Sequence, residues 1–138
     1  MRRRAWLKLV VAGGLFTRGR SVLAQAAQTW RVFMMRAFEM RCQAEAAGDQ
    51  PYGAVVVKDR DIIAESPSRV IIARNADAHA EREAIRLAQQ RLGGSSLAGC
   101  VLVSTSRPCG LCEQAAHLAG IARMIYGEDM IDGGAPRG

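Results

Sequence analysis

Residues 98–112 read AGCVLVSTSRPCGLC, and this stretch joins a strand pattern to the start of a helix. The run Cys100–Thr105 is short, apolar and rich in β-branched residues, which is typical of a buried strand. Pro108 follows, and proline is well tolerated in the first turn of a helix, which we expect to extend to about Ala119. Ala122–Tyr126 then predicts another strand. Strand, helix and strand in this order indicate a sheet with a parallel pair.

Two cysteines stand at the start of that helix, Cys109 and Cys112. A spacing of three positions brings both sulfur atoms to one side of the first turn. The partial positive charge at a helix N-terminus favours thiolates, which are the form in which cysteine binds zinc. Because C-x-x-C motifs also occur as redox pairs, this motif alone leaves metal and thiol chemistry open.

A second motif, His79-Ala80-Glu81, opens another predicted helix, which extends to Leu92 and ends at Gly93-Gly94. His79 would supply a third zinc ligand. Three protein ligands leave the fourth tetrahedral position open to water, and this distinguishes a catalytic zinc site from a closed structural one. Glu81 could then sit beside that water and accept its proton.

An amphipathic helix and a hairpin are predicted before the histidine. Apolar residues recur at steps of three and four along Trp30–Ala47, as on the buried stripe of a helix. Gly53–Lys58 and Asp61–Glu65 are short strand patterns separated by the tight turn Asp59-Arg60. Ser66–Ala78 has the composition of a loop. We therefore expect one α/β domain in which helices cover a sheet.

The composition fits one compact soluble domain, but the charge is unevenly distributed. The chain has 138 residues, 19 lysines and arginines, 13 acidic residues and a formal net charge of +6. Six of the basic residues and none of the acidic ones fall in residues 1–26, which leaves 13 bases against 13 acids in 27–138. The basic excess, which would otherwise suggest a nucleic-acid partner, therefore belongs to one end of the chain.

The same end has the layout of an export signal. Arg3-Arg4-Ala5-Trp6-Leu7-Lys8 resembles a twin-arginine motif, and a weakly apolar run, Leu9–Phe16, follows it. Ala24-Gln25-Ala26 then offers small residues for cleavage. The sequence therefore predicts twin-arginine export to the periplasm or the exterior.

On this basis we expect residues 1–26 to be the signal, 27–127 the folded domain and 128–138 a flexible tail. The alternative is an amphipathic N-terminal helix or an uncleaved anchor, and without export the protein would be cytoplasmic. No run of about 18 uninterrupted apolar residues predicts a stable membrane span.

Four stretches together resemble the cytidine/deoxycytidylate deaminase superfamily, and most closely its guanine deaminase and tRNA adenosine deaminase branch. They are PYGAVVVKDRDIIAE (51–65), AHAE (78–81), AGCVLVSTSRPCGLC (98–112) and IARMIYG (121–127). H-x-E followed by P-C-x-x-C is the signature of zinc nucleobase deaminases. The resemblance implies a three-layer α-β-α cytidine deaminase-like fold with a mixed sheet, and one Zn²⁺ per chain.

The resemblance also implies roles for single residues. The metal ligands would be His79, Cys109 and Cys112. Glu81 would be the catalytic proton shuttle in a hydrolytic deamination that removes an amino group, as ammonia, from a guanine-, cytosine- or adenine-type base or nucleoside. The substrate-lining positions carried over in the same way are Tyr52, Ala54, Ser68 and Ala80.

The chain differs from this branch where substrate binding is concerned. Ser68 stands where relatives carry an asparagine that binds the base, and Arg107 stands where they carry a glutamate before Pro-Cys. The chain ends soon after the strand Ala122–Tyr126, so we expect it to lack the last strand and the C-terminal helix of the family. Family members commonly assemble, and we expect a homodimer.

Other interpretations stay open at this point. Cys109 and Cys112 could be a redox pair, or the zinc site could stabilise a non-catalytic module. A tRNA adenosine deaminase-like activity is a further alternative, although export would make nucleic acid an improbable partner and favour free bases or nucleosides. Cys42 and Cys100 could form a disulfide after export. We expect His117 to be a surface or packing residue rather than a ligand.

Overall fold

A computed structural model describes residues 21–138 of the chain. Its elements are α1 (Val22–Ala46), β1 (Gly53–Lys58), β2 (Asp61–Pro67), α2 (Ala80–Leu92), β3 (Val101–Ser104), α3 (Gly110–Ala119), β4 (Arg123–Tyr126) and β5 (Ile131–Gly134). The twin-arginine motif and the apolar run after it lie outside the described residues. None of the helices in 21–138 combines the length and the apolar character that a membrane crossing requires.

The five strands form one mixed sheet in the order β2-β1-β3-β4-β5. β1 is antiparallel to both β2 and β3, β3 is parallel to β4, and β4 is antiparallel to β5. The β1–β2 hairpin closes through Asp59 and Arg60, whose φ angles of 50° and 69° belong to a two-residue hairpin turn. The hairpin, the parallel pair and the mixed sheet expected from the sequence are therefore confirmed.

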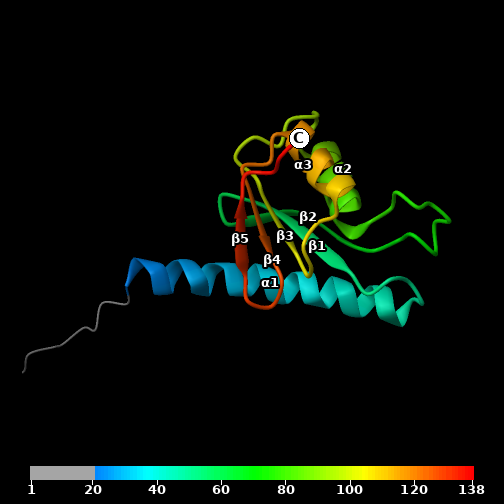
Figure 1. The fold of residues 1–138 in the computed structure, drawn as a ribbon, viewed down its shortest axis with the longest axis horizontal. Helices are drawn as coiled ribbons and strands as arrows, with labels where there is room; N and C mark the ends of the chain where they lie inside the picture. The colour runs from blue at the N-terminus through cyan, green and yellow to red at the C-terminus, as the bar shows by residue number, and fades with distance from the viewer. Residues whose placement is uncertain (1–20) are drawn as a thin grey trace, which may run out of the picture.

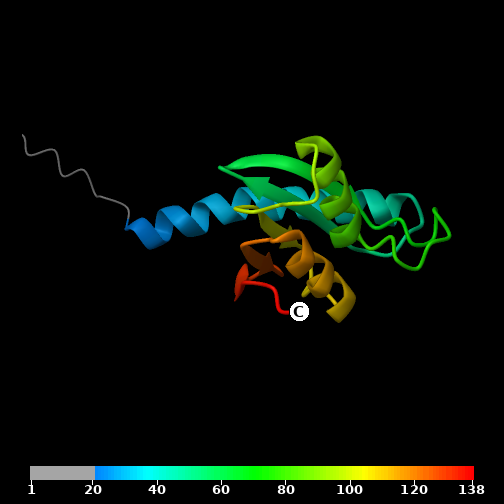
Figure 2. The ribbon, with the colours of Figure 1, turned by 90° about the horizontal axis from the view of Figure 1, so that it is seen from above.

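Helices cover both faces of the sheet, as Figures 1 and 2 show: α1 lies on one face, and α2 and α3 lie on the other. The alternation of side chains along the strands separates two cores. Val55 and Val103 face α1 together with Phe33 and other large residues. Val56 faces α2 and α3 in a core that is rich in alanine. This is the expected three-layer α-β-α arrangement.

Gly53 fixes the distance between α1 and the start of β1. A Cβ atom at this position would lie 2.1 Å from the carbonyl oxygen of Ala37 and 2.5 Å from the backbone nitrogen of Arg41. Only glycine allows the two backbones to approach so closely. The peptide before Gly53 is therefore held against α1, and this segment leads into the functional site.

The C-terminal end differs from the prediction. Residues 128–138 were expected to be a flexible tail after a last strand at Tyr126, but they contain β5, which pairs with β4 through Tyr126–Ile131 and Ile125–Asp132. The sheet thus has a fifth strand, and the prediction that its last strand is missing is wrong. Pro136, two residues after β5, is buried, and its carbonyl oxygen lies 3.2 Å from Nδ1 of His117.

Helix α1 begins at Val22, eight residues before the apolar stripe that predicted it. The Ser21 side chain caps it by accepting a hydrogen bond of 3.2 Å from the backbone nitrogen of Ala24. All residues from Val22 to Gln28 are exposed. Periodicity could not predict this part of the helix because its residues contact neither core.

Candidate active site

The three predicted metal ligands meet where two helices begin. His79 is the N-cap residue of α2, Cys109 is the N-cap residue of α3, and Cys112 lies in the first turn of α3. Nδ1 of His79 lies 3.6 Å from Sγ of Cys109 and 3.4 Å from Sγ of Cys112. All three donor atoms lie within 4.8 Å of one another. The sequence motifs 30 positions apart thus form one cluster.

This donor set fits zinc. Nitrogen and sulfur are the ligand atoms that zinc prefers, and bond lengths of ~2.0–2.3 Å at tetrahedral angles separate neighbouring donors by about 3.5 Å. The distances from His79 to the two sulfur atoms have this value. The His79 side chain makes no capping hydrogen bond to its own helix, so its Nδ1 is available to a metal.

The start of α3 presents a hydrogen-bond donor to the sulfur atom of Cys109. Its Sγ accepts a hydrogen bond from the backbone nitrogen of Cys112 at 3.4 Å, and the helix N-terminus adds partial positive charge. Cys112 is fully buried, and burial followed by the nearby charge of Glu81 raises the pKa of its thiol. Without a cation the protonated form of this thiol is favoured, whereas a bound metal ion favours the thiolate.

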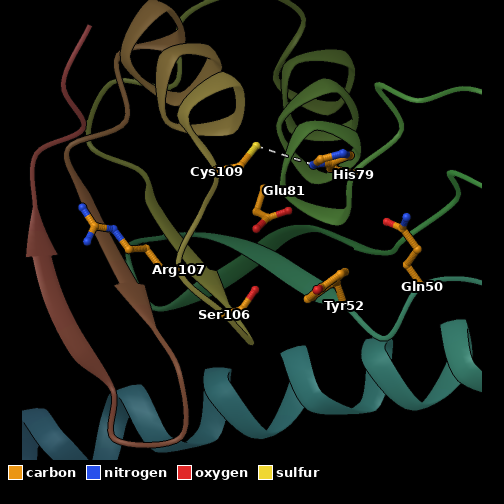
Figure 3. Close-up of a pocket in the computed structure, with 7 residues that line it drawn as sticks. All are labelled: Gln50, Tyr52, His79, Glu81, Ser106, Arg107 and Cys109. Atoms are coloured by element: carbon orange, nitrogen blue, oxygen red, sulfur yellow. Dashed lines mark hydrogen bonds between the residues drawn. The ribbon is translucent and has the colours of Figure 1, made fainter.

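Glu81 lies beside the ligand cluster but is not part of it. Its side chain is 5% exposed, and its Oε2 lies 3.8 Å from Sγ of Cys112. In Figure 3 the carboxylate extends from α2 toward the space below His79 and Cys109. Burial raises the pKa of Glu81. A carboxyl group in this setting exchanges a proton more readily near neutral pH than an exposed one does.

A pocket of about 530 Å³ opens in front of this cluster. Its lining residues are Gln50, Tyr52, His79, Glu81, Ser106, Arg107 and Cys109, which Figure 3 shows as sticks. A volume of this size suits a small organic molecule. One wall of the pocket carries Glu81 and two of the three ligands, His79 and Cys109, and the other residues come from loops at the edge of the sheet.

The register of the sheet explains why those loops meet. Ala54 of β1 is paired with Ser104 of β3 in antiparallel orientation, so the start of β1 and the end of β3 lie at one edge. Backbone and side-chain hydrogen bonds between Gly53 and Thr105, of 3.0 and 3.2 Å, extend this pairing by one residue. The residues just before β1 and just after β3 therefore face the same pocket.

Of the four predicted substrate-lining residues, the structure brings Tyr52 into the pocket. Tyr52 is 42% exposed and lies opposite the ligand cluster. Ala54 and Ala80 are fully buried in the core that β1 shares with α2 and α3. Ser68 is 1% exposed and is absent from the pocket lining, because its hydroxyl donates to Oδ1 of Asp49 at 2.9 Å.

Asp49 is a residue whose importance the sequence did not reveal. Beside the hydroxyl of Ser68, its carboxylate accepts backbone hydrogen bonds from Gln50, Ile71 and Ile72 at 2.8, 3.1 and 2.9 Å. Burial alone would raise the pKa of Asp49, but these four donors outweigh it and hold the pKa below its usual value. Asp49 thereby ties the loop that leads to His79 to the segment that carries Tyr52.

Gln50 and Ser106 are two further pocket residues that the sequence patterns did not indicate. Gln50 lies three residues before β1 and Ser106 lies two residues after β3, at the edge of the sheet where the pocket lies. The antiparallel pairing of β1 with β3 was the missing information, because the strand patterns alone do not define which strands are neighbours.

The remaining cysteines and histidine lie apart from the site. Cys42 is exposed on α1, whereas Cys100 is buried in the core on the opposite face of the sheet, so the disulfide considered between them is not formed. His117 is exposed on α3 and contacts the backbone of Pro136. It is a packing residue, as expected.

Comparison with known proteins agrees with this geometry. Residues 27–128 match the family model described as the cytidine and deoxycytidylate deaminase zinc-binding region. Guanine deaminase of Bacillus subtilis is 38% identical over 101 residues, which are 72% of this chain and 65% of that protein. A tRNA-specific adenosine deaminase of Agrobacterium fabrum is 40% identical over 96 residues, 67% of this chain and 63% of that protein. The chain spans slightly less than two thirds of the length of these relatives.

Solved structures agree as well. The structure of guanine deaminase from Bacillus subtilis matches with a TM-score of 0.68 at 38% identity. The matched region is 70% of this chain and 62% of that chain. A structure from a study of A-to-I editing by tRNA:A34 deaminases has the same TM-score of 0.68 and covers 70% of each chain. Because the matched region contains the whole ligand cluster and Glu81, this chain belongs to the cytidine and deoxycytidylate deaminase zinc-binding family.

Proposed function

We propose that this protein is a zinc-dependent hydrolase that removes an amino group, as ammonia, from a nucleobase or nucleoside. One observation carries the proposal: a buried carboxyl group, Glu81, lies next to a His-Cys-Cys cluster at the wall of a pocket. A structural zinc site needs four protein ligands and no carboxylate beside it. This cluster has three ligands within residues 21–138, and its surroundings suit catalysis.

The chain's own residues would hold the metal and the substrate in fixed positions. His79, Cys109 and Cys112 would bind Zn²⁺ from two helix starts whose backbones are anchored by the sheet. Zinc in such a site lowers the pKa of a bound water toward ~7 and so makes a nucleophile available at neutral pH. Tyr52, on the opposite side of the pocket, presents an aromatic ring against which a planar base can pack.

Glu81 would move the protons that the reaction requires. A water oxygen forms a bond to the amino-bearing ring carbon, and the carbon–nitrogen bond breaks. Glu81 accepts a proton from the water and delivers it to the departing nitrogen, so that ammonia leaves. The second proton of the water passes to the ring nitrogen beside the reacting carbon, and a carbonyl remains. Burial of Glu81 supports this role, because a raised pKa brings the carboxyl group closer to the pH at which it both accepts and donates.

The decisive experiment combines metal analysis with a substrate panel. Purified protein is expected to contain about one zinc per chain and to release ammonia from at least one of guanine, cytosine, adenine, their nucleosides or a tRNA anticodon stem. H79A is expected to lose the zinc and all ammonia release. H117A is the matched control, because His117 lies outside the cluster, and it should keep both.

Two results would overturn this function. Metal-free protein with a reversible Cys109–Cys112 disulfide would favour thiol redox chemistry. One zinc per chain without ammonia release from any member of the panel would favour a non-catalytic zinc module. Circular dichroism of H79A establishes whether a loss of activity comes from the site or from loss of fold.

Small bases or nucleosides are the substrates we favour over tRNA. The described domain has no excess of positive charge, since residues 27–138 hold 13 bases and 13 acids. The tRNA-specific relatives support the alternative. The anticodon stem in the panel decides between them, because efficient deamination of the stem but of no free base or nucleoside would favour RNA editing.

We further propose export through a twin-arginine signal in residues 1–26. The six basic residues of this segment and the exposure of Val22–Ala26 support it, because cleavage after Ala26 would remove no residue of either core. Export predicts the protein in the periplasmic or extracellular fraction, and R3K/R4K should retain it in the cytoplasm. An equal cytoplasmic location of both forms would contradict the proposal.

A homodimer is proposed as the working form. Leu111 and Leu118, which are 60% and 78% exposed and seven positions apart on α3, support it by presenting one apolar stripe to solvent. Light scattering of purified protein should give twice the chain mass. A monomeric mass at micromolar concentration would contradict this assembly.

A further inference from the structure

Arg107 is the only basic side chain among the residues that line the pocket, apart from the ligand His79. It is exposed at the rim, directly after Ser106 and before the buried Pro108. Within residues 21–138, ion pairs engage Arg36, Arg41, Arg82, Arg86 and Arg123, but none engages Arg107. Its guanidinium is therefore available to a molecule in the pocket.

The backbone that carries Arg107 is fixed. The hydroxyl of Ser104 donates to the carbonyl oxygen of Ser106 at 2.7 Å, and the Pro108 ring restricts the chain on the other side. Figure 3 shows the guanidinium directed away from Glu81 and from His79. Arg107 therefore does not neutralise the catalytic carboxylate, and its charge lies at some remove from the reacting atoms.

The other lining residues do not offset this charge. Glu81 is the one carboxylate of the lining, and it is 5% exposed at the metal wall. Gln50, Tyr52 and Ser106 are neutral polar residues. The rim thus presents a positive charge with five hydrogen-bond donors in a planar fork, which matches the oxygen atoms of a phosphate or carboxylate.

We propose that Arg107 is a specificity-determining residue that binds an anionic substituent of the substrate, so that this site prefers an aminated heterocycle bearing a phosphate or carboxylate over its neutral parent. This inference rests on the proposed deaminase function. The amino-bearing carbon would lie at Glu81, and the anionic group would lie at the rim, on the side of Arg107. Phosphate and carboxylate share the recognition chemistry, and the experiment distinguishes them.

The test measures binding and turnover for matched pairs of ligands. Guanosine is compared with guanosine 5′-monophosphate, and cytosine with 5-carboxycytosine, by calorimetry and by kcat/KM for ammonia release. For the wild type, we expect the anionic member of at least one pair to be preferred by ~10-fold, the usual strength of a charge-assisted hydrogen bond at a partly exposed site. High salt should reduce this preference.

Variants at Arg107 should abolish the preference, because they should lower kcat/KM and affinity for the anionic ligands more than for their neutral parents. In R107Q, the anionic ligand is expected to bind and react about as well as its neutral parent. In R107E, the neutral parent is expected to be preferred, because like charges repel. R31E is the matched control: Arg31 is exposed on α1, on the opposite face of the sheet, and the substitution changes the net charge by the same amount. It should leave the preference unchanged.

Failure of anion selection by Arg107 can be distinguished from failure of the proposed deaminase function. A preference confined to the phosphate pair or to the carboxylate pair supports the inference and identifies the anion. Equal wild-type binding of neutral and anionic ligands, or an equal loss for both in R107E, overturns it even if neutral bases are deaminated. Absence of turnover with every ligand overturns the deaminase function, while calorimetry still reports whether Arg107 selects the anion.

Discussion

Two buried carboxyl groups of this molecule have opposite surroundings. Asp49, between α1 and β1, is 7% exposed and accepts hydrogen bonds from Ser68 and from three backbone nitrogens. Glu81, in the first turn of α2, is 5% exposed, and the one side chain that donates to it is Cys112, at 3.8 Å. Donors keep the pKa of Asp49 low in spite of burial, whereas burial raises the pKa of Glu81.

Under the proposed function, this difference separates a structural carboxylate, Asp49, from a reactive one, Glu81. A carboxylate with four donors holds its charge and stabilises the loop that supplies those donors. A buried carboxyl group with few donors and access to a pocket can gain and lose a proton during a reaction. Substitutions at the two positions should therefore affect different measurements, stability at Asp49 and turnover at Glu81.

The largest effect is expected for E81Q. Glutamine keeps the shape of the side chain but cannot transfer a proton, so kcat for ammonia release should fall by ~10³-fold, within the range attributed to general acid–base catalysis. Zinc content and melting temperature should stay at the wild-type values. E83Q is the matched control, since Glu83 lies two residues later on α2 and pairs with Arg86. Near-normal turnover in E81Q would contradict the role of Glu81 in proton transfer.

A smaller effect, on stability, is expected for D49A. It leaves the Ser68 hydroxyl and the backbone nitrogens of Ile71 and Ile72 without their acceptor, which should lower the free energy of unfolding by about 3 kcal/mol in urea denaturation. Turnover at permissive temperature should fall far less than in E81Q. An unchanged urea midpoint would contradict the anchoring role of Asp49.

The stability that Asp49 contributes should also depend on pH. Because its pKa is lowered on folding, its contribution is complete above the unfolded value of about 3.8 and is lost as pH falls through the lower folded value. The stability difference between wild type and D49N should therefore be constant from pH 7 to pH 5 and shrink below pH 4. A constant difference down to pH 3 would indicate that the charge of Asp49 is not involved.

The contrast also explains what the sequence could and could not predict. His79, Glu81, Cys109 and Cys112 were predictable because each pair lies at the start of one helix, and local spacing determines where the side chains point. Asp49 was not, because after Gly48 it has the composition of an ordinary helix end. Its role depends on Ser68 and on Ile71 and Ile72, 19 to 23 positions away.

The ends of the fold were missed for a related reason. β5 contains Gly133 and Gly134 and has no apolar alternation, so its strand conformation comes from pairing with β4 and not from its own sequence. Arg123 and Asp132 form an ion pair across the same two strands. Contacts of this kind between neighbouring strands are not visible in a local pattern, and the same limit applies to the exposed first turns of α1.

The smallest effect is expected for S68A. This variant distinguishes two roles of Ser68: the hydrogen bond to Asp49, and the base binding that the family resemblance implies. If Ser68 serves Asp49, its replacement removes one hydrogen bond to a charged acceptor and should cost ~1–2 kcal/mol of unfolding free energy, with KM unchanged. S66A is the matched control, because Ser66 is 2% exposed and its hydroxyl donates to the neutral carbonyl of Pro67 at 2.7 Å. It should cost less than S68A. A raised KM in S68A, with unchanged stability, would instead assign Ser68 to base binding and make its contact with Asp49 incidental.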